Sequence, residues 1–489
     1  MPTPITPILA IDRKARQPLH RQIYEGYRES IVNGSLRPGQ RVPSTRSLAA
    51  ELRVSRIPVL TAYSQLLAEG YFQSRSGAGT TVSLSLPDQP VTAPRSLRFS
   101  PTRGVRAPKV AKRSLSDSIQ NPPWRRGWGA FAVGQVAAEQ FPLRVWNSLV
   151  ARHCRAATSQ SLDYGHPMGL KALREAIASY LRTARGVRCE DDQIMIVSGS
   201  QQALDISARV LLEPGDRVWM EEPGYRYARR VFYLNGSRII PVPVDHDGLN
   251  VTLGIRRCRH ARAVLVTPSH QYPLGVTMSA SRRLQLLDWA ARSGSWILED
   301  DYDSEFRYEG MPISSLQGLD SSARVIYIGT LSKVLFPSLR LGYLVVPREL
   351  VDHFVTVRLT MDIGPATFLQ AVLADFIAEG HFARHIRRMR LLYQERRNAL
   401  VASLAKEFGS AARITGEQAG MHLCVVLDGI SDRDVLARAA RAKLWLVPLS
   451  SSYIGKSPRQ GFILGFGSTP ASAMPNVVAK FHAALGSHR

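Results

Sequence analysis

Cysteine is scarce in this sequence. The four cysteines, Cys154, Cys189, Cys258 and Cys424, stand far apart and form no Cys-x-x-Cys pair, so we expect neither a metal site nor a disulfide framework. No apolar run reaches the roughly 18 residues that a membrane-spanning helix needs, and Met1–Lys14 lacks the apolar core of a signal peptide. We therefore expect a cytoplasmic protein with no membrane partner.

Acidic residues are outnumbered, with 39 Asp and Glu against 63 Lys and Arg. Residues 1–128 hold 20 basic against 7 acidic residues, whereas the other 361 residues hold 43 against 32. The positive charge is therefore denser in the first quarter, which is typical of a segment that contacts nucleic-acid phosphates. A preference for arginine throughout the genome is the alternative explanation.

Three regions follow from length and composition. A chain of 489 residues is too long for one core. Residues 83–128 hold seven prolines and nine basic against two acidic residues, which predicts a basic linker between a domain at 1–82 and a domain at 129–489. From 129 onward, short apolar runs alternate with helical segments, which predicts an α/β domain with a mostly parallel sheet.

The first region has the pattern of a helix-turn-helix followed by a hairpin. Apolar residues at four-residue steps predict a helix over 19–31. Ser44 and Ser55 are expected to cap two further helices, the last of which is predicted to bury Val59, Tyr63, Leu66 and Leu67 on one face. Two segments around Ser76-Gly77-Ala78-Gly79 predict the hairpin, or wing.

The stretch "PLHRQIYEGYRESIVNGSLRPGQRVPSTRSLAAELRVSRIPVLTAYSQLLAEGYFQSRSGAGT" resembles a GntR-type winged helix over its full length. The resemblance implies binding to double-stranded DNA, with contacts from Arg46, Ser55, Arg56, Arg75 and Gly77.

Two positions depart from the GntR pattern. Arg53 stands where glycine is usual, so we expect a left-handed arginine at a cost of about 1 kcal/mol. Pro58 has no N–H, so the predicted Ser55 cap must rely on the N–H of Ile57.

In the second domain, "YIGTLSKVLFPSLRLGYLVVP" places Lys333 just after an apolar strand. A lysine partly desolvated at such a place has a lowered pKa and suits Schiff-base formation. Thr330 and Ser332 can offer hydroxyls to a phosphate, and Arg340 can offer a guanidinium group.

A second motif, "WILEDDYDSEFRYEG", places Asp300 at the end of another strand. A buried carboxylate needs a cationic partner, which a protonated pyridine nitrogen supplies, and Tyr302 can hydrogen-bond the phenolate oxygen of such a ring. Asp301 and Asp303 alternate with these residues and are expected to face solvent or a helix end.

Further candidates lie in three other segments. Ser200 and Gln201 open a helix whose N–H groups can bind a phosphate. Tyr225 can stack on a planar ring, and His270 and Gln271 follow another predicted strand. Each feature alone has an ordinary alternative, such as a solvated lysine, a capping aspartate or a packing tyrosine.

Together these segments make residues 130–489 resemble the fold-type-I aminotransferase family, whose ring-nitrogen and Schiff-base positions match Asp300 and Lys333. The resemblance implies pyridoxal 5'-phosphate (PLP) bound as an aldimine to Lys333. It also implies a mostly parallel sheet with helices on both faces and a smaller C-terminal α/β subdomain.

A GntR-type winged helix joined by a basic linker to such a domain is the layout of MocR-type regulators, which the stretches "YGHPMGLKALREAIASYL", "SHQYPLG" and "EDDYDSEFRY" also resemble. This implies a bacterial homodimer that binds operator DNA on the nucleoid and senses PLP or an amino compound. Ile463, in "GFILGFGS", replaces the arginine that grips a substrate carboxylate in related enzymes, which favours PLP or an amine as effector unless Arg226 or Arg459 substitutes. The alternatives are a catalytically active aminotransferase with an appended DNA-binding module and a dimerisation scaffold without cofactor.

Overall fold

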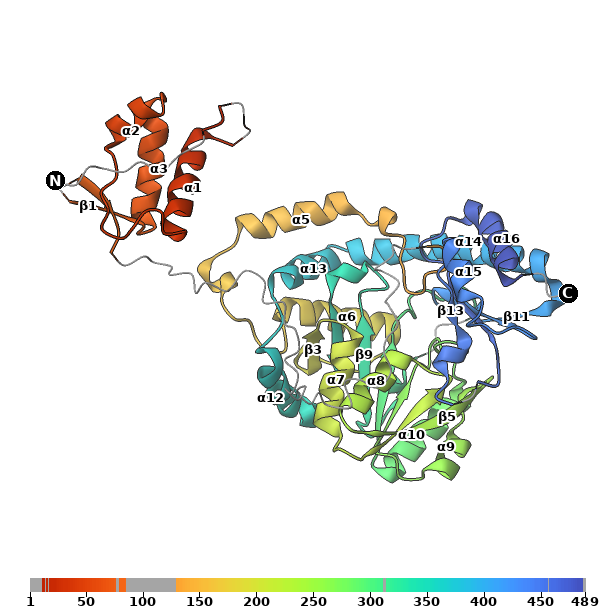
Figure 1. Ribbon diagram of the computed structural model, residues 1–489. Coiled ribbons are helices and arrows are strands. Elements are labelled where there is room, and N and C mark those ends of the chain that lie inside the picture. The colour runs from red at the N-terminus through yellow and green to blue at the C-terminus, as the bar shows by residue number, and fades with distance from the viewer. Residues whose placement is uncertain are drawn as a thin grey trace, which may run out of the picture. The chain divides into compact units, whose positions relative to one another are not determined.

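The computed structural model describes residues 11–13, 15, 17–75, 79–84, 129–310, 314–455 and 457–486. The chain forms two compact units that divide between Lys109 and Val110. Each unit is described by itself (Figure 1).

The N-terminal unit packs three helices against a two-stranded hairpin. Its elements are α1 Leu19–Val32, α2 Thr45–Glu51, α3 Arg56–Ala68, β1 Phe72–Arg75 and β2 Gly79–Val82. Three aromatic rings form its centre: Tyr27, Tyr63 and Phe72 meet edge to face with centroids 5.1–5.6 Å apart. The predicted winged helix-turn-helix is thus confirmed.

Three local predictions in this unit have different outcomes. The Ser44 hydroxyl caps α2 by accepting the N–H of Ser47 at 3.1 Å, as predicted, and Arg53 is left-handed with φ 53°, also as predicted. The predicted Ser55 cap is wrong, because Ser55 precedes α3 but its side chain makes no capping hydrogen bond. Pro58, which has no N–H, occupies the third helical position, and the N–H of Ile57 does not replace it.

The buried face of α3 also differs from the prediction at one position. Leu67 is 37% exposed, whereas Val59, Ala62, Tyr63 and Leu66 are buried. The interior side therefore follows the three- and four-residue steps from Val59 through Ala62 and Leu66.

The large unit is built on an eight-stranded sheet of order β3-β10-β9-β8-β7-β4-β5-β6. Its strands are β3 Ile194–Val197, β4 Arg217–Glu222, β5 Arg238–Asp245, β6 Gly248–Leu249, β7 Ala263–Val266, β8 Trp296–Asp301, β9 Val325–Thr330 and β10 Gly342–Val345. The pairs β9–β8, β8–β7, β7–β4 and β4–β5 are parallel, whereas β10 and β6 run antiparallel to their neighbours. The predicted mostly parallel sheet is confirmed.

Helices cover both faces of this sheet. They are α5 Leu143–Arg155, α6 Lys171–Arg185, α7 Ser200–Leu211, α8 Arg226–Leu234, α9 Val251–Arg257, α10 Ala280–Ser293, α11 Leu316–Leu319, α12 Val351–Asp362 and α13 Phe368–Ala378. Buried residues of α5, α6 and α13 pack with Ile194, Tyr327 and Tyr343 on one face. Residues of α7, α8 and α12 pack with Met195 and Ile328 on the other. The result is a three-layer α/β/α core.

A smaller C-terminal subdomain completes the large unit (Figure 1). Its sheet, of order β11-β12-β14-β13, consists of β11 Ala412–Thr415, β12 His422–Leu427, β13 Val447–Pro448 and β14 Gly461–Gly465, and all its pairs are antiparallel. Its helices are α14 His381–Phe408, α15 Leu436–Arg441 and α16 Met474–Leu485. Phe462 and Leu464 of β14 pack with Phe481 of α16 in its core.

Short 3₁₀ helices connect several elements of the large unit. They are η2 Ala138–Gln140, η3 Ser159–Leu162, η4 Asp191–Gln193, η5 Pro337–Leu339, η6 Arg348–Leu350, η7 Gly409–Ala411, η8 Leu449–Ser452 and η9 Ala471–Ala473. None of the helices in the described ranges is both long and apolar enough to pass through a bilayer.

Candidate functional site

The predicted site residues of the large unit gather at the carboxyl ends of the sheet strands. Asp300 is the penultimate residue of β8, Lys333 follows β9, His270 and Gln271 follow β7, and Ser200 begins α7 after β3. In the ladder, Asp300 is paired with Ile328 of β9. Carboxyl ends of parallel strands are where open α/β sheets bind ligands, so the topology brings four separate motifs to one edge.

Lys333 lies in a confined, poorly solvated position. Its Nζ donates a hydrogen bond to the carbonyl oxygen of Gly134 at 3.2 Å. A Cβ on Gly134 would lie 2.4 Å from that nitrogen, and the φ of +79° at this position favours glycine. Burial lowers the pKa of Lys333, although the carboxylates of Asp303 and Asp300 partly oppose the shift. A lowered pKa leaves more of the amine in the nucleophilic, neutral form.

Asp300 is a buried carboxylate with an unused oxygen. The residue is 5% exposed, and among the described residues its Oδ1 has no hydrogen-bond partner. Burial, with added repulsion from Asp301, Asp303 and Glu221, raises the pKa of Asp300 to about 7. A site of this kind fits a ligand that brings a positively charged N–H donor, as a protonated pyridine ring does.

A second group of residues suits an anion. Gly199, with φ +122°, leads into α7, and a Cβ there would lie 3.5 Å from the guanidinium of Arg340. Arg340 itself is left-handed with φ 50°. Nearby polar atoms are free: Gln201 Nε2 and Ser332 Oγ are buried without a partner among the described residues. The N-terminus of α7 together with these donors fits a phosphate.

The remaining candidates from the sequence, among them Tyr225, Tyr302, Gln271 and Thr330, make the following contacts. Tyr225 is half-buried at the start of α8, and burial raises its pKa with a contribution from the Asp300 charge. The Tyr302 hydroxyl donates to the His270 carbonyl oxygen at 2.9 Å. The Gln271 amide accepts the N–H of Leu274 at 3.0 Å within its own turn. It also donates to the Pro223 carbonyl oxygen at 2.9 Å, which ties this turn to the segment after β4. Thr330 Oγ1 accepts the N–H of Ser332 at 3.3 Å.

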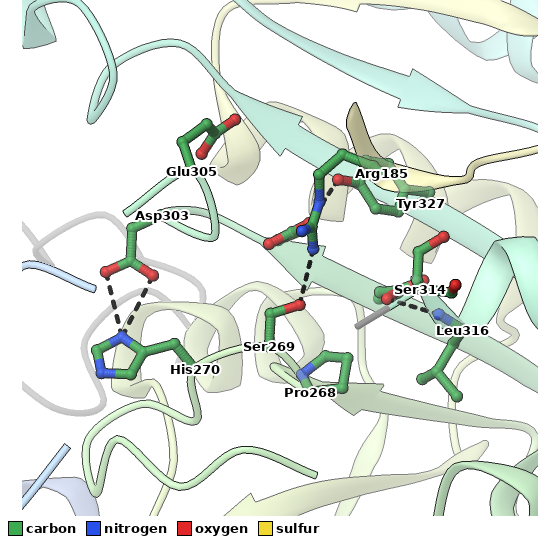
Figure 2. A network of polar contacts seen from close by, with 12 residues as sticks. Arg185, Pro268, Ser269, His270, Asp303, Glu305, Ser314, Leu316 and Tyr327 are labelled. Atoms are coloured by element: carbon green, nitrogen blue, oxygen red, sulfur yellow. Dashed lines mark hydrogen bonds and ion pairs between the residues drawn. The ribbon is translucent and has the colours of Figure 1, made fainter. Parts of the chain in front are cut away.

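The expectation that Asp301 and Asp303 face solvent or a helix end is wrong, because both are buried. Arg185 donates from Nε and Nη2 to Asp301 Oδ2, at 3.0 and 2.7 Å, and from Nη2 to Ser269 Oγ. Asp303 lies 3.2 Å from Nδ1 of His270 (Figure 2). Asp301, the last residue of β8, is buried because helices cover both faces of the sheet. Asp303 lies beyond β8 and is buried against His270 and Met421, whose N–H it accepts at 3.1 Å.

Arg185 and His422, two buried residues that contact residues of the predicted site motifs, were not identified from the sequence. Arg185 continues the buried stripe Leu173, Ile177 and Leu181 of α6 at four-residue steps, a signal that could have identified it as a buried cation. His422 of β12 lies with its ring centroid 4.6 Å from that of His270, and no local pattern marked it.

In the N-terminal unit, the helix residues predicted to contact DNA share one exposed region. Arg46, Ser55 and Arg56 are exposed at the starts of α2 and α3. Arg56 Nε donates to Thr45 Oγ1 at 3.2 Å, which joins the first turns of the two helices. The Arg75 backbone pairs with Gly79 in the hairpin. Gly77 lies outside the described residues.

Comparisons with known proteins agree with this layout. Residues 19–82 match the family described as bacterial regulatory proteins, gntR family, and residues 130–460 match aminotransferase class I and II. The large unit is also similar to a solved Pyrococcus horikoshii kynurenine aminotransferase, at 28% identity and TM-score 0.71, over 77% of this chain and 96% of that one. A DNA-binding module fused to an aminotransferase-like domain defines the class: a transcriptional regulator.

The particular family follows from full-length relatives. The chain is 42% identical to the probable rhizopine catabolism regulatory protein MocR of Rhizobium meliloti, over 96% of this chain and 94% of that protein. It is 33% identical to the pyridoxine biosynthesis regulator PdxR of Corynebacterium glutamicum, over 95% of each chain. The chain belongs to the MocR-type regulators, which combine a GntR-type winged helix with an aminotransferase class I and II domain.

Proposed function

We propose that this regulator holds PLP covalently on Lys333, senses PLP itself or an amino compound, and thereby controls how its winged helices bind operator DNA. The observation that carries the proposal is the unpaired buried Oδ1 of Asp300 at the same sheet edge as a desolvated lysine. Bound PLP supplies an electrophilic carbon and an electron-withdrawing ring. The fold family is PLP-dependent, which supports the assignment.

The chain's own residues divide the work of holding the cofactor. Asp300 keeps the ring nitrogen protonated, because an ionised carboxylate buried there is stabilised by a cation. The hydroxyls of Thr330 and Ser332, the guanidinium of Arg340 and the N-terminus of α7 at Ser200 and Gln201 hold the phosphate. Tyr225 would stack on the ring, Tyr302 and His270 would lie on the side of its phenolate oxygen, and Gln271 would hold the turn that carries His270.

The DNA contacts are proposed at Arg46, Ser55, Arg56, Arg75 and Gly77. The exposed side chains at the start of α3 support this assignment, because the N-terminal residues of a recognition helix contact base edges. Residues 83–128 are the linker of this scheme, between a winged helix at 1–82 and an effector domain at 129–489. Such a regulator acts in the cytoplasm, on the nucleoid.

A homodimer is proposed from an exposed apolar surface on the large unit. Leu359, Ile363, Phe368 and Leu369 are 38–47% exposed around the junction of α12 and α13, and Tyr164 is 82% exposed. Gly165 lies against Thr367 and Gly364 against Pro167, so the Tyr164 loop adjoins the helix junction. An apolar patch of this kind indicates an association surface, and a dimer matches the two half-sites of a typical operator.

The effector is proposed to be PLP or an amine rather than a free amino acid. Ile463 is fully buried in β14 and paired with Cys424 and Val447, so this position offers no cation to a carboxylate. Two other arginines are candidate substitutes for a cation at position 463. Arg459 is exposed, and the Arg226 guanidinium lies 5.0 Å from the Tyr227 ring centroid.

The decisive experiment is borohydride reduction of the PLP-treated protein followed by peptide mass mapping. We expect a pyridoxyl adduct on Lys333 and none in Lys333→Ala, while Lys333→Ala retains operator affinity without effector. An unmodified Lys333 peptide overturns the proposal. A catalytically active aminotransferase is the alternative, and sustained turnover of amino donors at about 1 s⁻¹ or faster would favour it.

A further inference from the structure

The amino-terminal edge of the large sheet, opposite the cofactor site, carries a row of arginines. β4 begins with Arg217 and β5 with Arg238, while Arg262 and Arg324 directly precede β7 and β9. Backbone hydrogen bonds keep these residues in register, since the Arg262 N–H bonds the Arg217 carbonyl and Arg217 is paired with Arg238. Neighbouring strands lie about 4.8 Å apart, so the row presents one cation at four of the five neighbouring strands β9-β8-β7-β4-β5.

The loop after α9 adds further positive charge at this edge. Arg259 and His260 of this loop are exposed, as is Arg256 in the last turn of α9, and α9 lies next to α10 (Figure 1). Arg217, His260 and Arg262 line a surface hollow of about 310 Å³ together with Asp216 and Gly294. We call the six arginines Arg217, Arg238, Arg256, Arg259, Arg262 and Arg324 the arginine edge.

The charges of the arginine edge are not neutralised by carboxylates. Within the described ranges, none of the six guanidinium groups is found within 4.0 Å of an Asp or Glu oxygen. Three other exposed arginines of the unit do have carboxylate partners, since Arg209 pairs with Asp205, Arg348 with Asp192 and Arg413 with Asp428. Three acidic residues lie nearby, but Asp216 and Asp320 accept N–H groups of their own loops, and Glu213 is exposed.

Two strands of the row begin with arginine and end in an acid, because Glu222 closes β4 and Asp245 closes β5. The other two strands, β7 and β9, end in Val266 and Thr330. Helix C-termini attract cations and account for Arg256, but they do not account for arginines at the starts of four strands. Five of the six arginines are exposed, and Arg324 is half-buried over the Trp296 ring. Exposed cations without carboxylate partners in a row form a surface for a polyanion.

We infer that the arginine edge binds the phosphate backbone of DNA, as a second contact surface beyond the winged helix. The inference rests on the proposed function, because it assumes a chain that binds DNA. Duplex DNA is favoured as the polyanion because its phosphates form a continuous row, and because a DNA-binding unit in the same chain raises the local concentration of DNA. The contact is independent of sequence, since guanidinium–phosphate pairs read no bases.

The test compares full-length variants on long non-operator duplex DNA across a salt series. Arg217→Gln/Arg259→Gln/Arg262→Gln removes three exposed, unpaired charges. We expect a salt-dependence slope shallower by roughly 2.7, about 0.9 for each lost phosphate contact, and affinity lower by about 10-fold or more at low salt. The matched control Arg209→Gln/Arg348→Gln/Arg413→Gln removes the same net charge from carboxylate-paired positions and should bind nearly as the parent does.

Two further measurements separate the possible failures. If the triple variant and the control lose affinity equally, or if neither changes the slope, the arginine edge is not a DNA contact. Preferential binding of the parent to phosphatidylglycerol vesicles over DNA, lost in the triple variant, also overturns the inference. Arg56→Ala should weaken operator binding by about 1–3 kcal/mol but keep the parent's slope on non-operator DNA within about one contact. A parent that binds no DNA instead contradicts the proposed function itself.

Discussion

At the scale of single residues, Asp300 is a carboxylate that the folded chain leaves without its counter-ion. Its pKa rises from the ordinary 3.8 to about 7. A folded-state pKa above the unfolded value means that the protonated form is favoured in the fold. The contribution of Asp300 to stability is therefore fully present below about pH 4 and is lost as the pH rises toward about 7.

This sign gives a prediction for the cofactor-free protein. As the pH rises from about 4 to about 7, the free energy of unfolding should fall less for Asp300→Asn than for the parent, and the difference should reach up to a few kcal/mol. Glu221, Glu299 and Glu305 also have pKa values raised to about 7, but they remain in both proteins, so the difference isolates Asp300. Urea unfolding at several pH values measures it, and parallel pH profiles would contradict the prediction. The control is PLP addition, which should stabilise the parent at neutral pH more than the variant.

The same residues show what could be predicted at this scale. The approximate positions of Asp300 and Lys333 were accessible because each ends or follows a distinct apolar strand. The burial of Asp301 was not accessible, because alternation shows only that successive side chains point to opposite faces, not that both faces are covered. The burial of Asp303, beyond β8, depends on His270 and on Met421 of the C-terminal subdomain. Their partners Arg185 and His270 come from α6 and the loop after β7, and sequence distance conceals such contacts.

At the scale of elements, the two serine caps of the N-terminal unit form a matched pair. The Ser44 hydroxyl makes its capping bond and the Ser55 hydroxyl does not. We predict that Ser44→Ala costs about 1 kcal/mol of stability, whereas Ser55→Ala costs less than about 0.5 kcal/mol. Thermal unfolding of the full chain measures both substitutions. Equal losses would mean that Ser55 caps α3 after all.

Helix and strand positions were largely predictable because they depend on local periodicity and turn residues. Ser55 and Leu67 show the limit of such reasoning. A serine at a helix start predicts a cap only if a free N–H lies opposite, and Pro58 removes one. Leu67 satisfies an apolar pattern, yet the packing partners of α3 lie on the side of Ala62 and Leu66.

At the scale of the whole molecule, regulation requires a coupling free energy between PLP binding at Lys333 and DNA binding by the winged helix. If PLP changes operator affinity by some factor, thermodynamic linkage requires operator DNA to change PLP affinity by the same factor, typically about 5- to 150-fold. The amino-acid sequence predicts both units, but this factor depends on how they communicate across the segment between them. A measurement on the intact protein is therefore needed.

We predict that the two factors agree, and that single substitutions separate the two sites. Arg56→Ala should weaken operator binding by about 1–3 kcal/mol if it reads a base, while the PLP absorbance spectrum stays that of the parent. Lys333→Ala should remove both factors, because the ligand then has no differential affinity for the two states of the regulator. Operator titrations with and without PLP, and PLP titrations with and without operator, supply the numbers. Unequal factors would indicate that one titration is not at equilibrium, whereas factors of one in the parent would mean that the PLP site and the DNA site are uncoupled, and the regulatory proposal would fail.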